Sequence, residues 1–266
     1  EPTEGAAEQY NHVRHVIAVM SGKGGVGKSL VAGLLAVTLR RNGHRVGVLD
    51  ADITGPSIPR MFFPNGARPG SSPLAILPAE TRTGIRVMSI NLLLESEDQA
   101  VIWRGPLISG AIRQFWTDVL WGELDYLIVD LPPGTSDASL TVLQSLPMSG
   151  VVLVTSPQAL AGMVVRKAAQ MVARVNVPLL GLVENMSYFT CPDTGKQYEV
   201  FGPSHSEQMA DALGISLLGR LPIDPRIASL CDAGQIEYCP TEAFEPIAEQ
   251  IETLAPEARK VALPGR

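Results

Sequence analysis

The 266-residue sequence lacks features that define several classes of protein. It has only three cysteines, an odd number that argues against a disulfide scaffold and favours a reducing, cytoplasmic compartment. It has no basic excess, since 21 Lys and Arg stand against 27 Asp and Glu, so nucleic acid is not an expected partner. Its apolar runs are far shorter than the roughly 20 residues of a membrane span, and no membrane association is expected.

The sequence does contain a regular alternation of strand-like and helix-like segments. Short apolar runs typical of buried parallel strands occur at residues 15–20, 45–49, 85–90, 126–129, 151–155, 179–184 and 217–220. Helical patterns occur between or after them at 28–41, 106–121, 136–146, 160–175, 205–213 and 243–254. The alternation predicts an α/β fold, a doubly wound and mostly parallel sheet with helices on both faces.

Other stretches depart from this rhythm. Residues 1–13 are polar and predict a flexible leader, residues 259–266 form a tail, and residues 14–258 are expected to form a single domain. Residues 55–84 contain six prolines and four glycines and predict a long surface insertion, whose role the sequence leaves open. A second irregular stretch covers residues 185–203.

A phosphate-binding motif follows the first predicted strand. The sequence GKGGVGKS matches G-x-x-x-x-G-K-[ST] and lies between a strand-like and a helix-like run, as this motif requires. Glycines let backbone N–H groups surround a phosphate at the positive end of the next helix. Lys28 is predicted to neutralise β- and γ-phosphate charge, and Ser29 to hold Mg²⁺. The predicted nucleotide-binding residues of this loop are Gly22, Lys23, Gly24, Gly25, Val26, Gly27, Lys28, Ser29 and Leu30.

Acidic residues at two strand ends complete a predicted hydrolytic centre. Asp50 and Asp52 follow the second strand, and Asp130 ends the run YLIVD, a Walker B pattern. The carboxyl ends of parallel strands face the ligand crevice, so these side chains are expected near the phosphates. Asp130 is predicted to hold Mg²⁺ directly or through water. Each aspartate taken alone could instead cap a helix.

Lys23 adds a second cation to the phosphate loop. The string KGGVGKS resembles the deviant P-loop of a group that includes MinD, ParA, the arsenite pump ATPase, the nitrogenase iron protein and the Mrp/ApbC family. The resemblance implies a homodimer in which Lys23 acts catalytically on the partner's nucleotide. It also implies that Asp52 belongs to switch I, where it orients the attacking water near Mg²⁺. A solvated turn lysine is the alternative for Lys23.

Four further segments resemble the Mrp/ApbC family of iron–sulfur cluster carriers over residues 15–254: DADITGPSIPR, WRGPLISGAI, DLPPGTSDASL and LVENMSYFTCP. The resemblance implies an ATPase that hydrolyses ATP slowly and serves as a homodimeric carrier or scaffold in cluster assembly. Its clients would be apo iron–sulfur proteins or an assembly scaffold. It further implies an adenine contact at Asn185 and a base-pocket position at Pro222. A simple turn role is the alternative for Asn185.

The sequence departs from that family at the cluster ligands. The family usually carries C-P-x-C after ENMS, so that each subunit of a dimer gives two thiolates to a shared [4Fe–4S] cluster. Here Cys191 is followed by Pro, Asp and Thr194, so a two-fold dimer offers two thiolates where such a cluster normally takes four. Cys191 is a candidate ligand or an unused surface thiol. Cys231 and Cys239 lack metal-motif spacing and are expected to be buried or incidental.

Two other functions fit the same nucleotide site. One is a regulatory ATPase switch of the MinD/ParA type, which needs Lys23, Lys28, Asp52 and Asp130 but no cysteine. The other is a nucleotide-binding subunit that serves another metalloprotein and requires an obligatory partner. Slow hydrolysis is expected of all three, so ATPase activity alone does not separate them.

Overall fold

The computed structural model describes residues 7–52, 55, 57–73, 75–93, 105–158 and 161–258. The strands are β1 (His12–Ser21), β2 (Val46–Asp50), β3 (Gly70–Ser71), β4 (Ile76–Leu77), β5 (Ala79–Glu80), β6 (Arg86–Ser89), β7 (Glu123–Asp130), β8 (Gly150–Thr155), β9 (Leu179–Thr190), β10 (Gln197–Tyr198) and β11 (Leu217–Pro222). The α-helices are α1 (Lys28–Arg41), α2 (Ile58–Phe62), α3 (Gly105–Thr117), α4 (Asp137–Ser145), α5 (Ala161–Arg174), α6 (Ser206–Leu213), α7 (Pro225–Asp232) and α8 (Glu245–Leu254). Short 3₁₀ helices are η1 (Glu8–Tyr10), η2 (Ile90–Leu93) and η3 (Ile236–Tyr238).

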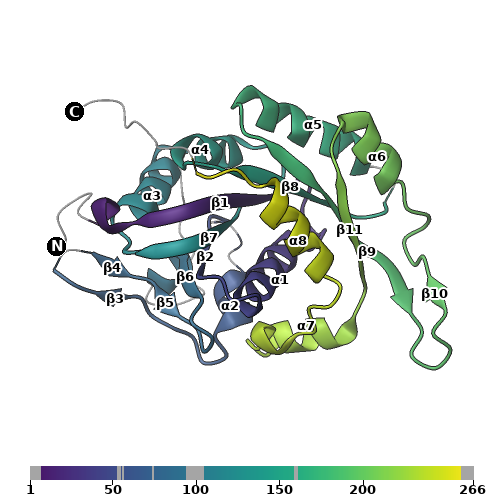
Figure 1. Ribbon diagram of the computed structural model, residues 1–266, viewed down its shortest axis with the longest axis horizontal. Coiled ribbons are helices and arrows are strands. Elements are labelled where there is room, and N and C mark those ends of the chain that lie inside the picture. The colour runs from purple at the N-terminus through teal and green to yellow at the C-terminus, as the bar shows by residue number, and fades with distance from the viewer. Residues whose placement is uncertain are drawn as a thin grey trace.

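Nine of these strands form one sheet in the order β10-β9-β8-β1-β7-β2-β6-β5, and β11 pairs with β9. The central strand β1 runs parallel to both β7 and β8. Only β10 and β5 run antiparallel to their neighbours in this sheet. Helices cover both faces (Figure 1), as expected because parallel strands need crossover connections. The predicted doubly wound, mostly parallel α/β fold is confirmed.

The two faces of the sheet carry separate hydrophobic cores. Side chains of a strand alternate between faces, so Ile17 and Val19 of β1 pack with residues of α1, α2, α7 and α8. Val16, Ala18 and Met20 point the other way and pack with residues of α3, α4, α5 and α6. Burial on both sides explains why β1 has an unbroken apolar run instead of polar alternation.

Every predicted helix and strand has a counterpart, but the boundaries differ in places. The predicted helix 106–121 ends at Thr117, because Asp118 and Leu120 instead exchange backbone hydrogen bonds with Ile76. The strand predicted over 179–184 continues as β9 to Thr190. Helix α7 was not predicted at all. None of the helices in the described ranges is long and apolar enough to cross a membrane.

The predicted leader and insertion need correction. Residues 7–13 are part of the fold, because Ala7 is fully buried and β1 already begins at His12. The Asn11 side chain fixes this entry by bonding to Val119 O and to Gly122 N. Residues 1–6 and the tail 259–266 lie outside the described residues. The segment 55–84 is not only surface, since α2 contributes buried side chains to the α1-side core and β5 joins the sheet.

Candidate functional site

The phosphate-binding motif forms a tight loop between the end of β1 and the start of α1. Gly25 and Gly27 have φ angles of 78° and 77°, in the left-handed region that glycine adopts without strain. Gly22 packs against α5, where an added Cβ would lie 2.6 Å from the carbonyl carbon of Val164. Val31 N donates to Gly27 O at 3.0 Å, which closes the first turn of α1. A positive φ therefore favours glycine at positions 25 and 27, and close packing favours it at position 22.

Lys28 lies between the two aspartates that the sequence placed at strand ends. Its ammonium donates to Asp130 Oδ1 at 2.5 Å and lies 3.8 Å from Asp52 Oδ2 and 3.3 Å from Ser29 Oγ. Lys28 is 5% exposed and Asp130 is fully buried. The parallel pairing of β7 with β1 and β2 brings Asp130 opposite Val19 and Asp50, so the strand ends converge on the loop. The structure thus brings together Lys28, Ser29, Asp52 and Asp130.

The buried carboxylates at this edge resist ionisation. Burial raises the pKa of Asp130, against the lowering influence of the charge and hydrogen bond of Lys28. Burial and the neighbouring charge of Asp130 raise the pKa of Asp50 well above its usual range. Asp50 accepts hydrogen bonds from Asp52 N at 3.1 Å and Ile58 N at 3.3 Å, so it organises the chain after β2. Asp50 is therefore a scaffold residue, whereas Asp130 faces the loop.

The oxygen atoms around Lys28 fit a magnesium ion. Among the described side chains, Asp130 Oδ2 is the buried polar atom that has no hydrogen-bond partner. No group of three or more His, Cys, Asp or Glu residues in the described ranges could hold a metal by itself. Mg²⁺ typically uses one or two carboxylates and completes its shell with water and substrate phosphates. Ser29, Asp52 and Asp130 provide such an oxygen-only, partial set.

The Lys23 side chain contacts Gln158 of its own chain. Its ammonium hydrogen bonds to the side-chain oxygen of Gln158, and its carbonyl accepts from Ser21 Oγ at 2.9 Å. Gly134, in the LPPGTSD segment after β7, donates its N–H to Ser21 O at 2.9 Å. The segment that resembles switch II is therefore tied to the phosphate loop. The trans role of Lys23 stays a prediction.

Asn185 and Pro222 meet at a cavity of about 180 Å³ beside the loop. Asn185 Nδ2 donates to Val26 O at 2.9 Å, which links the end of the predicted sixth strand to the phosphate loop. The rest of the wall is mainly apolar and comes from α1, β11, α7 and the segment before α8: Leu30, Leu34, Leu221, Asp224, Arg226, Ile227, Pro240, Glu242, Ala243 and Phe244. An apolar pocket with a few polar groups suits a flat heterocyclic base.

Sequence reasoning missed the contribution of α7 to this pocket. Asp224 caps the helix, its Oδ1 accepting from Arg226 N at 2.9 Å, and Pro225 occupies the first turn. An Asp followed by Pro is a recognised start signal for a helix. That signal was available in the string PIDPRIASL, but the helix has only eight residues and little periodicity.

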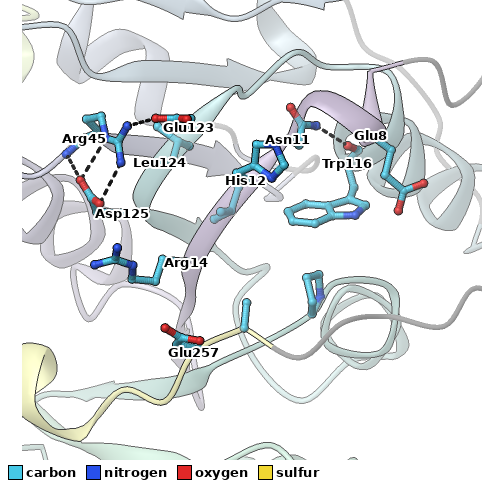
Figure 2. Close-up of a pocket in the computed structure, with 13 residues that line it drawn as sticks. Glu8, Asn11, His12, Arg14, Arg45, Trp116, Glu123, Leu124, Asp125 and Glu257 are labelled. Atoms are coloured by element: carbon cyan, nitrogen blue, oxygen red, sulfur yellow. Dashed lines mark hydrogen bonds and ion pairs between the residues drawn. The ribbon is translucent and has the colours of Figure 1, made fainter.

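A larger cavity of about 650 Å³ lies at the other end of the parallel strands, where they begin. It is lined by residues where β1 and β7 begin, and in Figure 2 Arg45 is bound by Glu123 and Asp125. None of the site residues predicted from the sequence lines this cavity. Open parallel sheets bind ligands at the carboxyl ends of their strands, so the smaller pocket is the better candidate.

The three cysteines lie in two different environments. Cys191 is partly exposed in the turn between β9 and β10, where a hydrogen bond from the Thr194 hydroxyl lowers the pKa of its thiol. Cys231 and Cys239 are buried in the α1-side core. A hydrogen bond to Cys239 raises the pKa of Cys231, and the same bond lowers the pKa of Cys239. Their predicted burial is confirmed, and they do not join Cys191 in a metal group among the described residues.

Comparison with known proteins gives consistent results. The family profile described as "ParA: NUBPL iron-transfer P-loop NTPase" matches residues 12–258. The iron-sulfur cluster carrier protein of Methanocaldococcus jannaschii is 44% identical over 92% of this chain and 86% of its own length. The cytosolic Fe-S cluster assembly factor CFD1 of Chaetomium globosum is 44% identical over 84% and 78%, respectively. A nucleotide-binding protein of Archaeoglobus fulgidus, solved with ADP, is 44% identical with a TM-score of 0.79, covering 88% of this chain and 91% of that one.

Proposed function

The chain belongs to the family of NUBPL iron-transfer P-loop NTPases, and from this premise we propose that it is an ATP-binding, slowly hydrolysing homodimeric carrier or scaffold for iron–sulfur cluster assembly. Its relatives include proteins named as cluster carriers and as a cytosolic assembly factor. The proposed clients are apo iron–sulfur proteins or an assembly scaffold. A reducing, cytosolic compartment is consistent with three free thiols.

The proposed nucleotide chemistry follows from the contacts of Lys28. On ATP binding, the ammonium of Lys28 would exchange Asp130 Oδ1 for phosphate oxygens, and Ser29 and Asp130 would hold Mg²⁺. A magnesium ion held there would supply positive charge against the phosphate charge that develops during transfer. Asp52 lies close enough to this group to orient water, and Lys23 supplies charge to the nucleotide of the partner subunit. Gly22 to Leu30, with Asn185 and Pro222, form the remaining nucleotide contacts.

The observation that carries the cluster role is the placement of Cys191. Its thiol is partly exposed, has a lowered pKa, and lies in the turn that directly follows β9, the strand that carries the loop contact of Asn185. Thiolate is the form of cysteine that binds iron. Two subunits bring two such thiolates, and the cluster as cargo needs about four ligands, so the others come from a client, a scaffold or a small thiol. Partial ligation by the protein suits a cargo that must be released.

Anaerobic reconstitution with iron and sulfide tests this function. We expect stable iron binding per dimer with a charge-transfer band at about 400 nm, typical of thiolate-ligated clusters. Cys191→Ala should lose this iron, while the matched control Cys231→Ala, which removes a buried thiol, should retain it. Iron bound equally by Cys191→Ala would eliminate Cys191 as a ligand. Absence of iron in the unmodified protein, with and without added thiol, would refute the carrier function.

The presence of Thr194 in place of a second cysteine favours a second candidate function.

 This candidate is a regulatory ATPase of the MinD/ParA type, which needs the nucleotide residues but no cluster. The observation in its favour is that the second thiol of the C-P-x-C pattern is missing and that the described residues contain no three-ligand metal group. A nucleotide-binding subunit for another metalloprotein would behave similarly but would require its partner. ATP-dependent dimerisation without iron binding would support the switch, and activity only with a co-purified subunit would support the third function.

A further inference from the structure

Strand β9 contains an irregularity where it passes the phosphate loop. Arg220 of β11 pairs with Glu184 and Pro222 pairs with Tyr188, so β9 carries extra residues between these two pairs. Within them, Met186 has a φ of 58°, in the left-handed region that non-glycine residues rarely adopt. Bulges of this kind often re-aim side chains beside functional sites. Here the bulge directs Asn185 to the carbonyl of Val26.

Arg220 connects the bulge to two carboxylates, those of Glu184 and Glu199. Glu184, only 1% exposed, binds the Ser187 hydroxyl across the bulge and accepts from Arg220 Nε at 3.3 Å. Arg220 uses a second nitrogen, Nη2, to donate to Glu199 Oε1 at 3.4 Å. A single arginine therefore joins the buried start of the bulge to a residue just beyond β10.

Glu199 belongs to the hairpin that carries Cys191. The hairpin forms because Gln197 and Tyr198 of β10 pair with Thr190 and Phe189 at the end of β9. It projects beyond the rest of the sheet in Figure 1, and β11 pairs with the part of β9 that precedes it. Contacts between the hairpin and the sheet therefore decide where Cys191 lies relative to the nucleotide loop.

We propose that Arg220 is a positioning residue that couples nucleotide binding to the reactivity of Cys191. A nucleotide that contacts Asn185 changes the conformation of the bulge, and the bulge sets the position of Glu184. Because Arg220 binds both Glu184 and Glu199, the position of the hairpin changes with it. This inference rests on the proposed function for its biological meaning. The coupling itself involves only the nucleotide loop and one thiol, so it can be measured in the cluster-free protein.

The test measures the alkylation rate of Cys191 by N-ethylmaleimide, with and without saturating ADP·Mg²⁺, using mass spectrometry to separate it from the buried cysteines. We expect nucleotide to change the rate at least about fivefold, the lower end of typical coupling between two sites. Arg220→Gln should bring the ratio of the two rates close to one. Glu199→Gln, which alters an exposed residue and spares Glu184, should do the same without changing nucleotide affinity.

Arg45→Gln provides the matched control. Arg45 also bridges two carboxylates, Glu123 and Asp125, but where the parallel strands begin and away from the phosphate loop. This variant should therefore keep the wild-type ratio of the two alkylation rates. The coupling is overturned if the wild-type ratio is one, or if either Arg220→Gln or Glu199→Gln retains it. These outcomes differ from failure of the carrier function, which appears as absence of iron in reconstitution whatever the alkylation ratio.

Discussion

Replacing Lys28 by alanine should destabilise the nucleotide-free protein as well as abolish ATP binding. Its ammonium is the cation within 2.5 Å of Asp130 and 3.8 Å of Asp52, and both Lys28 and Asp130 are almost completely shielded from water. Removing one partner of such a buried pair leaves an uncompensated charge and typically costs about 3–5 kcal/mol. Urea unfolding at neutral pH should show a loss of that size in Lys28→Ala.

The loss should depend on pH with a definite sign. Lys28 lowers the pKa of Asp130 and of Asp50, so its removal raises both beyond values that burial already elevates. The folded protein then binds more protons than the unfolded chain between the ordinary pKa of 3.8 and the raised folded-state values. Stability of Lys28→Ala should therefore increase as pH falls through this window, by about 1.4 kcal/mol per pH unit for each extra proton.

A second substitution isolates the charge. Lys28→Ala combined with Asp130→Asn removes both members of the pair and should recover a large part of the stability, but not ATP binding. Lys167→Ala, which removes an exposed lysine on α5, should change stability by less than about 0.5 kcal/mol. The reasoning is refuted if Lys28→Ala is as stable as the wild type at pH 7, or if its deficit is the same at lower pH.

Three further substitutions test other parts of the site. Lys23→Ala should retain ATP binding and lose dimer-dependent hydrolysis in a turnover assay; unchanged hydrolysis would exclude a trans role. Asn185→Ala should weaken ADP binding about 3- to 10-fold by calorimetry, as expected for one lost hydrogen bond; unchanged affinity would exclude a base contact. Gly22→Ala should lower the unfolding free energy because its Cβ would lie 2.6 Å from a helix backbone, whereas Gly24→Ala, with nothing within 4 Å, should not. Equal stability of the two variants would contradict this packing argument.

The parts of the site that could be predicted from sequence are those defined by local geometry. The phosphate loop is contiguous, and three of its four glycines, Gly22, Gly25 and Gly27, occupy positions where close packing or a positive φ favours glycine. Asp130 was also predictable, because the apolar run of a buried parallel strand ends at this residue and ligands bind at the carboxyl ends of such strands. The direct contact between Asp130 and Lys28 required only that β7 lie beside β1.

The remaining features depend on contacts between segments that have no shared pattern. The bulge at Met186 interrupts β9, so apolar periodicity ended the predicted strand before its continuation to Thr190. The pocket beside the phosphate loop combines residues of α1, α7 and β11. The bond from Asn185 to Val26 becomes visible only when β9 is packed beside that loop. Arg220 has no sequence signal for its two carboxylate partners, because Glu184 and Glu199 lie on either side of a hairpin.

The environment of Cys191 supports its proposed ligand role, although Thr194 stands where the family resemblance implies a second cysteine. Thr194 occupies the position of that partner, and its hydroxyl bonds to the Cys191 sulfur and lowers the pKa of the thiol. The turn is also closed by backbone bonds between Cys191 and both Gly195 and Lys196, which fix the main chain at Cys191. A lowered pKa favours the thiolate, which is the form of cysteine that binds a metal. In the proposed carrier, Thr194 therefore supports thiolate formation at Cys191 while leaving coordination positions on the cargo for the acceptor protein.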